Sequence, residues 1–309
     1  MRHPISGRRP GSGVRGAPVR GGSRPLTETD LIQRFLPYLA GAGGDLVIGA
    51  GEDDAAAWRE ADGSYTVATC DTSVEGLHFD LGRQRADDVG WRALAFALGD
   101  LSAKGALPTY GLVSLSLPRS WIADVAESVY RGLSGLAGEV GLKLVGGDTT
   151  AAPGPASLTL ALLGTTRVRP IPRSAARPGW RVAVTGPLGG ASLLERRPRP
   201  LLERGVELAA AGLCCGDISD GLLRELDKFS VAAGVGARLQ LALVPCAGGA
   251  TSEQAMASGE EVELVCCGKD PLPEGLTVVG ELTADPGVRV LDGRGEEVHV
   301  TERGYDHFA

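Results

Sequence analysis

Aspartate residues recur beside glycines, or where a helix or strand is expected to end, in five separate segments of the chain. The segments contain Asp53–Asp54 near Gly51, Asp71, Asp100, Asp148 after Gly146–Gly147, and Asp217 with Asp220 around Ser219. Carboxylate oxygens are the ligands that Mg²⁺ prefers in proteins. Taken together, the five segments predict a site at which several carboxylates converge on magnesium ions.

The glycines in these segments point to a phosphate ligand as well as to a metal. Glycine lets backbone N–H groups approach phosphate oxygens, and Mg²⁺ usually takes some of its ligands from phosphates. The segment 217–222 is expected to lead into a helix, whose amino-terminal dipole favours an anion. Without a metal, converging carboxylates would repel one another and be driven toward protonation. The pattern therefore favours a site for a metal and a nucleotide.

Each aspartate, taken alone, is better explained as a helix cap or a turn residue. Asp30, Asp87 and Asp124 are interpreted in that way, as caps or surface charges. The sequence contains neither the lysine motif of a P-loop nor the protein-kinase signature set. A GxGxxG pattern at 11–16 has no strand before it and no helix after it, so it does not predict a dinucleotide site.

The elements that must position these carboxylates fall into two halves of mixed helix and strand, divided near residue 170. Residues 86–106 carry apolar residues on two helical stripes, so Asp100 is expected on a buried helix face. Strands are expected at 65–70 and 142–146, each leading directly into an aspartate-containing segment. A proline- and arginine-rich stretch at 167–180 connects the halves. Helices are further expected at 27–40, 121–140 and 217–234, and strands at 109–118, 156–166, 180–186 and 237–245.

The composition is that of an ordered protein with an acidic body. Hydrophobic residues make up 43% of the 309 residues and the net charge is −7. Residues 1–25 contain six arginines and no acidic residue, and we predict that they form a disordered basic tail. An acidic body argues against a nucleic-acid partner, and no apolar run reaches the ~18 residues of a membrane span. A cytoplasmic protein is expected.

The six cysteines do not show the spacing of a zinc site. They occur as two adjacent pairs and two single residues, and they are expected to be buried, reduced thiols of a cytosolic protein. They are Cys70, Cys214, Cys215, Cys246, Cys266 and Cys267.

Six motifs in the same order resemble those of thiamine-monophosphate kinase, a family of the ATP-using superfamily of aminoimidazole ribonucleotide synthetase and selenophosphate synthetase. They are EDDAA at 52–56, TCDTSVEGLHF at 69–79, GDLSAKGA at 99–106, LVGGDTT at 144–150, DISDGL at 217–222 and GYDHF at 304–308. This resemblance implies an α+β / α/β protein of two domains. Residues 26–168 would bind ATP and metal, and their four-stranded sheet would form a barrel with its twin in a homodimer. Residues 172–309 would form an α/β domain.

The resemblance also implies the roles of individual residues. Metal ligands would be Asp54, Thr69, Cys70, Asp71, Asp100, Asp148, Asp217 and Asp220. ATP contacts would be Gly147, Asp148, Arg173 and Ser219, and substrate contacts would be His78, Glu260 and Tyr305. Two family motifs are altered. Cys70 stands where threonine or serine is usual, and the family's SGEDYEL is SGEEVEL here, with Glu261 for aspartate and Val262 for tyrosine.

The reaction implied is transfer of the γ-phosphoryl group of ATP to thiamine monophosphate, giving thiamine diphosphate and ADP, with several Mg²⁺ ions. Because the acceptor is an ionised phosphate oxygen, neither a general base nor a covalent nucleophile is expected, and transfer would be in line. Two alternatives remain open at this point. One is a sister enzyme that phosphorylates another small molecule; the other is a protein that binds thiamine phosphates or nucleotides without turnover.

Overall fold

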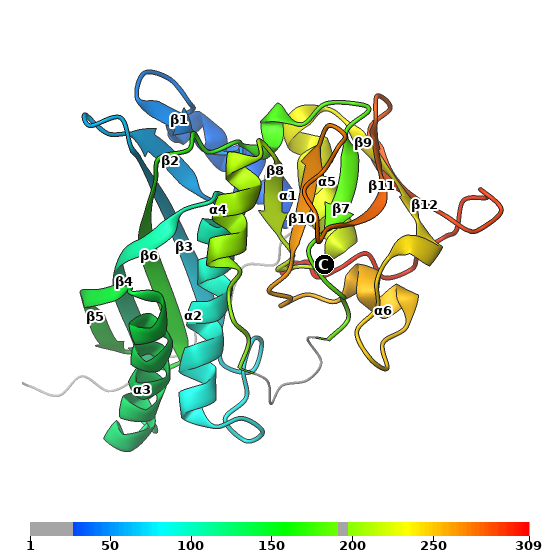
Figure 1. Ribbon diagram of the computed structural model, residues 1–309. Coiled ribbons are helices and arrows are strands. Elements are labelled where there is room, and N and C mark those ends of the chain that lie inside the picture. Colours follow the sequence, from blue (N-terminus) through cyan, green and yellow to red (C-terminus); the bar gives the residue numbers. More distant parts are fainter. Residues whose placement is uncertain (1–26, 191–196, 309) are drawn as a thin grey trace, which may run out of the picture.

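The computed structural model describes residues 27–190 and 197–308 and contains two sheets, each accompanied by helices (Figure 1). The first sheet is built from strands within residues 46–166 and the second from strands within 181–291. The prediction of two sheet-containing halves with mixed helix and strand is therefore confirmed. The basic segment 1–25 lies outside the described residues.

The first sheet has six strands, in the order β1-β2-β3-β6-β4-β5, rather than the four that were expected. All neighbours pair antiparallel except β4 and β5, which are parallel. The strands are β1 (Leu46–Ile48), β2 (Ala56–Arg59), β3 (Tyr65–Val74), β4 (Leu107–Leu117), β5 (Lys143–Ala151) and β6 (Ser157–Thr166).

Two strands extend beyond the aspartates that were expected to follow their ends. Asp71 lies inside β3, paired with Leu160, and Asp148 lies inside β5, paired with Ser114. The predicted ends were wrong because pairing with neighbouring strands continues past each aspartate, into threonines whose β-branched side chains are compatible with extended backbone. The two carboxylates are therefore fixed by a hydrogen-bonded ladder rather than carried on turns.

One face of the first sheet is covered by α2 (Ala86–Ala103) and α3 (Ala123–Val140). The two helices approach so closely that a Cβ on Gly90 of α2 would lie 2.0 Å from a backbone oxygen of α3. A Cβ on Gly132 of α3 would likewise lie 1.8 Å from a backbone oxygen of α2. As expected from its two apolar stripes, α2 is buried over most of its circumference.

The second sheet also has six strands, in the order β12-β9-β11-β7-β10-β8, and only β12 and β9 are parallel. Its strands are β7 (Arg181–Val184), β8 (Cys214–Asp217), β9 (Gly236–Gln240), β10 (Leu264–Gly268), β11 (Thr277–Thr283) and β12 (Gly287–Leu291). Its helices are α4 (Leu202–Ala210), α5 (Leu222–Ala233) and α6 (Ser252–Ala257), with a 3-10 turn η3 (Leu241–Leu243). The strand expected at 237–245 ends at Gln240, because the 3-10 turn η3 follows it directly.

The helix α2 lies between the two sheets, because it packs on the first sheet and also contacts α4 and β8 of the second half (Figure 1). The connecting stretch 167–180 contains a 3-10 turn, η2 (Arg173–Ala175), that lies against α5 and β8. The carboxyl end of α2, the turn η2 and the end of β8 are therefore neighbours at the junction of the halves.

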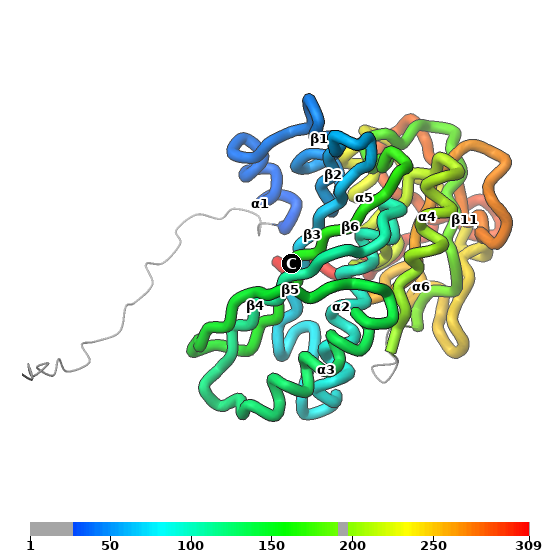
Figure 2. Tube along the Cα trace, turned by 60° about the vertical axis from the view of Figure 1, so that its left-hand side comes forward, coloured from blue at the N-terminus to red at the C-terminus, as the bar shows by residue number. Residues whose placement is uncertain are grey.

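The first described helix, α1 (Glu28–Phe35), begins at the predicted cap, where Thr27 and Asp30 form a capping box. It leads into the 3-10 turn η1 (Leu36–Tyr38), and Figure 2 shows it beside β1 and β2 at one end of the molecule. At the other end of the chain, Asp306 accepts a hydrogen bond from the backbone N of Glu28 at 3.4 Å. Arg224 of α5 donates to the same carboxylate at 2.7 Å.

The expectation of buried thiols holds for four of the six cysteines. Cys214 and Cys215 of β8 pair with Cys267 and Cys266 of β10, and all four are buried and free. The single cysteines Cys70 and Cys246 are exposed, so for them the expectation was wrong.

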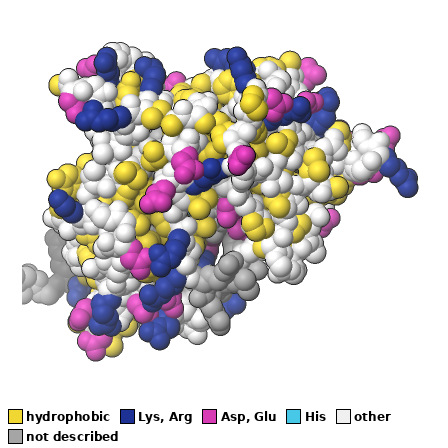
Figure 3. Space-filling view, viewed as in Figure 1, with side chains coloured by type: hydrophobic (Ala, Val, Ile, Leu, Met, Phe, Trp, Pro, Cys, Tyr) yellow, Lys and Arg dark blue, Asp and Glu magenta, His cyan; other side chains and the backbone are white. Residues whose placement is uncertain are grey.

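Across the described residues, no helix has the length and apolar character that crossing a bilayer requires. On the face seen in Figure 3, basic and acidic side chains are interspersed.

Candidate active site

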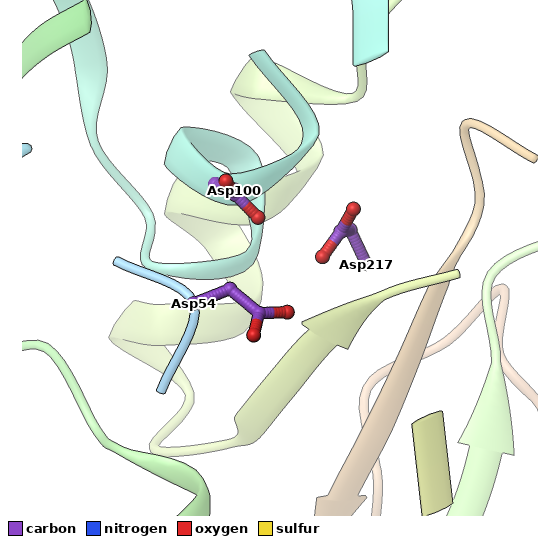
Figure 4. A group of neighbouring side chains, drawn as sticks. All are labelled: Asp54, Asp100 and Asp217. Carbon is purple, nitrogen blue, oxygen red and sulfur yellow. The ribbon is translucent and has the colours of Figure 1, made fainter. Parts of the chain in front are cut away.

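Three of the predicted metal ligands meet at the junction of the two halves. Carboxylate oxygens of Asp54, Asp100 and Asp217 all lie within 4.8 Å of one another. Figure 4 shows the three side chains pointing toward a common space from a loop, a helix end and a strand end. We call these residues the aspartate cluster.

Local structure explains why each side chain reaches this space. Asp54 lies on the loop between β1 and β2, Asp100 lies in the last turn of α2, and Asp217 is the last residue of β8. Gly99 lets α2 pack directly against β8, because a Cβ there would lie 3.3 Å from Asp217 Cβ. Gly216 leaves room beside β8 for the buried Glu225, because a Cβ there would lie 1.9 Å from Oε1 of that side chain.

Two members of the aspartate cluster, Asp100 and Asp217, have raised pKa values, whereas the pKa of Asp54 is lowered. Burial, together with the carboxylate of Asp54, raises the pKa of Asp100 to about 7. Burial and the nearby Asp100 and Asp54 raise the pKa of Asp217 well above its ordinary value. Although burial favours the neutral acid, Arg173 and Lys228 hold the pKa of Asp54 well below its ordinary value.

The aspartate cluster fits a hard divalent cation. Oδ1 of Asp217 is buried and accepts no hydrogen bond from any described residue, which leaves an oxygen available for coordination. Thr69 of β3 donates its hydroxyl to Oδ2 of Asp100 and orients that carboxylate. Three carboxylates without histidine or thiolate form the oxygen-only donor set that suits Mg²⁺.

Arg173, a predicted ATP contact, is buried beside the aspartate cluster, with a side chain that is 2% exposed. Its Nη1 donates to Asp53 at 3.1 Å, its Nη2 donates to Asp54, and its Nε donates to Glu225. These three carboxylates raise the pKa of Arg173 well above its ordinary value, against the effect of burial. The guanidinium is thus held by residues from both halves of the chain.

Lys104, Lys228, Asp53 and Glu225 complete this charged region. Only Asp53 belonged to the predicted carboxylate pattern, and it pairs with Lys104 and Arg173. Lys104, just after α2, donates to Asp53 and, at 2.7 Å, to the carbonyl of Cys215. Lys228 of α5 lies near Asp54, Asp220 and Glu225. Two sequence signals could have indicated these residues. One is a lysine within the apolar segment SAKGA; the other is a glutamate and a lysine three residues apart on α5.

Two other predicted metal ligands, Asp71 and Asp220, lie near the aspartate cluster. Asp71 is on the same face of β3 as Thr69. Burial raises the pKa of Asp71, with smaller contributions from the carboxylates of Asp220 and Asp54. Asp220 follows β8 and pairs with Lys228 at 3.0 Å. Asp71 therefore lies on the face of the first sheet that faces the aspartate cluster, and Asp220 lies close to Asp217 in the chain.

Asp148, Gly147 and Cys70 are not brought to the aspartate cluster within one chain. The pairing places Gly147 in the same row as Asp71, but three strands away, which is about 14 Å at ~4.8 Å per strand. Asp148 lies in the next row, with Thr72, so its side chain points to the opposite face from Asp71. Cys70 also points to that face, which leaves only its backbone on the side of the cluster.

The predicted substrate residues line one pocket of about 660 Å³, together with Ser219 and Asp220. His78, Glu260 and Tyr305 come from three distant parts of the sequence, and His307 joins them. The rings of His78 and His307 lie 5.2 Å apart, and the Tyr305 ring meets His307 edge-on at 4.9 Å. Burial and the neighbouring His307 lower the pKa of His78.

Glu260 is the described non-glycine residue with a positive φ, at 55°, a conformation that is uncommon outside functional sites and turns. Its N–H donates to the carbonyl of Ser219 at 2.6 Å, and its carboxylate accepts from Arg92 at 2.8 Å. The altered neighbour Glu261 points elsewhere and accepts a hydrogen bond from the backbone of Gly189 at 2.8 Å. The longer acid therefore supports a loop rather than the pocket.

A second pocket, of about 180 Å³, borders the charged region. It is lined by α1 and α5 and by Asp53, Asp54, Arg173 and Lys228. The predicted ATP contacts are therefore divided: Arg173 faces this smaller pocket, Ser219 lines the larger one, and Gly147 and Asp148 lie on β5.

Comparison with known proteins agrees with this fold. Residues 52–168 match the family model described as AIR synthase related protein, N-terminal domain. A solved structure of thiamine-monophosphate kinase from Stenotrophomonas maltophilia K279a is 28% identical, with a TM-score of 0.67, over 87% of this chain and 96% of that one. The AaThiL complex with AMPPCP and TMP is 24% identical with a TM-score of 0.76, over 93% and 100% of the chains, and shows the fold alone. Residues 52–168 thus carry a domain of the AIR synthase-related class.

Curated relatives identify the family within that class. Thiamine-monophosphate kinase from Rhodopirellula baltica is 35% identical over 265 residues, which are 76% of this chain and 81% of the relative. The enzyme of the same name from Escherichia coli K12 is 31% identical over 329 residues, covering 91% and 98% of the two chains. The chain belongs to the thiamine-monophosphate kinase family.

Proposed function

We propose that this protein transfers the γ-phosphoryl group of ATP to thiamine monophosphate, giving thiamine diphosphate and ADP. The observation that carries the proposal is the position of the aspartate cluster next to two pockets. Asp54 lines the smaller pocket, and Asp220, next to Asp217, lines the larger one. The names of the relatives support the choice of substrates.

Several Mg²⁺ ions would be held by the aspartate cluster together with Asp71 and Asp220, and bound Mg²⁺ would neutralise negative charge on the phosphates. Among the described residues, Oδ1 of Asp217 accepts no hydrogen bond and has only Arg173 Nη2, 4.0 Å away, as a cationic neighbour, and burial raises the pKa of Asp100; both carboxylates would therefore be stabilised by a bound cation. Asp148, whose side chain points to the opposite face of the sheet, would take part only in a dimer.

The residues of the chain have positioning and electrostatic roles in this scheme. The acceptor is a phosphate oxygen that is ionised near neutral pH, so the chain need not remove a proton from it. The main obstacle is repulsion between two anions, which positive charge at the junction reduces. The acceptor oxygen forms a bond to the γ-phosphorus while the bond to the ADP oxygen breaks, and no residue becomes phosphorylated.

The larger pocket suits the ring systems of thiamine. His78, Tyr305 and His307 offer aromatic faces and edges, against which a ring packs with favourable geometry. Glu260, fixed by Arg92, offers a carboxylate to the positively charged thiazolium or to the amino group of the pyrimidine. The phosphate of the substrate would then point past Asp220 toward the aspartate cluster.

We further propose that the protein acts as a homodimer through the uncovered face of the first sheet. Tyr110 and Leu112 of β4 and Leu163 of β6 lie on the face opposite α2 and are 47%, 49% and 38% exposed. An apolar patch of this kind is a usual site of association. Asp148 and Cys70 lie on the same face, so pairing of two copies would bring the predicted ATP contacts of β5 into the interface.

The direct test is incubation of the purified protein with Mg-ATP and thiamine monophosphate, followed by chromatography of the products. Equal amounts of thiamine diphosphate and ADP are expected. ADP formed only with other acceptors would favour a sister enzyme, and binding of thiamine monophosphate without product would favour a non-catalytic protein. Either result would reject the proposed reaction.

A further inference from the structure

Lys228 lies between the two pockets. Its Nζ is 3.4 Å from a carboxylate oxygen of Asp54, which lines the smaller pocket, and 3.0 Å from one of Asp220, which lines the larger pocket. A third carboxylate oxygen, of the buried Glu225, lies 3.5 Å away. If ATP and thiamine monophosphate occupy the two pockets, an ammonium group at this point is close to both of them.

Among the described cations of the charged region, Lys228 is the most accessible. The side chains of Lys104 and Arg173 are 1% and 2% exposed, whereas that of Lys228 is 27% exposed. Lys104 is anchored by backbone carbonyls and Arg173 by carboxylates on three of its nitrogens. The contacts of Lys228 are carboxylates alone, at the end of a flexible side chain. It is therefore the cation best able to move toward a ligand.

A divalent cation held by Asp54 and Asp220 would compete with Lys228 for the same oxygens. When Asp54 and Asp220 ligate a divalent cation, an ammonium 3.0–3.4 Å from those oxygens is repelled by it. The side chain is then free to turn toward a phosphate that shares the cation. Lysine commonly binds phosphate as a compact point charge.

We propose that Lys228 is a phosphate-binding catalytic residue, paired with Asp54 and Asp220 in the free enzyme and with oxygens of the nucleotide's phosphates in the complex. The inference rests on the proposed function. It adds a protein cation, the ammonium of Lys228, that contacts the phosphates during transfer. Lys228 keeps its proton throughout, because its role is to balance charge.

The test compares Lys228→Met, Lys228→Arg and the wild-type chain for binding of AMPPCP in the presence of Mg²⁺, by calorimetry. We expect K228M to weaken AMPPCP binding at least about tenfold, which corresponds to ~1.4 kcal/mol, and K228R to recover most of the loss. Lys269→Met is the matched control, because Lys269 is exposed on the second half and should bind AMPPCP as the wild type does.

A second measurement separates phosphate binding from a structural effect. Without nucleotide, K228M should bind Mn²⁺ as tightly as the wild type or more tightly, because a competing cation is gone. AMPPCP binding within twofold of wild type, or a loss of Mn²⁺ affinity that accounts for the weaker AMPPCP binding, would overturn the inference.

The same experiment distinguishes the inference from the reaction itself. If wild-type protein binds AMPPCP in a manner that depends on Lys228 but forms no thiamine diphosphate, the proposed acceptor is wrong and the role of Lys228 stands. If the protein forms thiamine diphosphate and K228M binds AMPPCP normally, the reaction stands and the role of Lys228 is wrong. Failure of the wild type to bind AMPPCP rejects both.

Discussion

Asp53 holds Arg173 at two points, accepting a hydrogen bond from its backbone N at 2.9 Å and another from its Nη1 at 3.1 Å. Both side chains are almost fully buried. Because Arg173 lies in the connection between the halves, this pair fastens the connection to the loop that carries Asp54. The position of the aspartate cluster thus depends on a residue that does not belong to it.

Replacing one ligand of the aspartate cluster should abolish most of the activity. We expect Asp217→Asn to lower kcat by at least ~10²-fold, the scale seen when a key electrostatic stabiliser is removed, and to weaken Mn²⁺ binding. Steady-state kinetics and Mn²⁺ titration measure the two effects. Asp285→Asn, in an exposed turn, is the control and should change neither. Normal kcat in D217N would show that the cation binds elsewhere.

In EDTA, the carboxyl of Asp100 should make the protein less stable as the pH rises. Its pKa is about 7 in the folded chain against an ordinary value of 3.8. Between about pH 4 and pH 7 the unfolded chain releases this proton and the folded chain keeps it, so the free energy of unfolding falls. Asp100→Asn should therefore gain in Tm relative to the wild type between pH 5 and pH 7.5. A constant difference in Tm would contradict the shifted pKa.

Breaking the buried pair of Lys104 and Asp53 should be costly for stability. Lys104→Met leaves the carboxylate of Asp53 buried with one cation fewer, and loss of one partner of a buried ion pair typically costs ~3–5 kcal/mol. Urea unfolding measures the loss. In the double variant with Asp53→Asn the loss should be smaller than the sum of the single losses, because the two residues interact. Additive losses would show that they are independent.

The proposed dimer predicts that a charge on the uncovered sheet face produces an inactive monomer. Leu112→Asp should halve the mass measured by light scattering, and kcat should fall because Asp148 lies on the same face. Exposed Val231 on α5 provides the control, since Val231→Asp should leave the mass unchanged. A wild-type protein that is already monomeric and active would reject the dimer.

Local sequence signals predicted much of the fold. The capping box at Thr27 and the two apolar stripes of α2 each specify their element through neighbours in the chain, and both are present. The extents of β3 and β5 were missed because strand pairing, which joins residues far apart in the sequence, extends both strands past their aspartates.

The candidate site was predicted in part for the same reason. Asp54, Asp100 and Asp217 could be selected as a group because each is a carboxylate in an unusual local setting. Lys104 and Lys228 could not, because a lysine becomes informative only when its burial and its acidic partners are known. The opposite directions of Asp71 and Asp148 depend on sheet register, which one sequence does not specify.

The contact between Asp306 and Glu28 places the first and last described segments next to each other, with Arg224 of α5 joining them. A short peptide linker between these segments would close the backbone into a ring at a place where Glu28 borders the smaller pocket and Tyr305 borders the larger one. The chain is thus suited to circular permutation, with new termini opened in an exposed turn distant from α5.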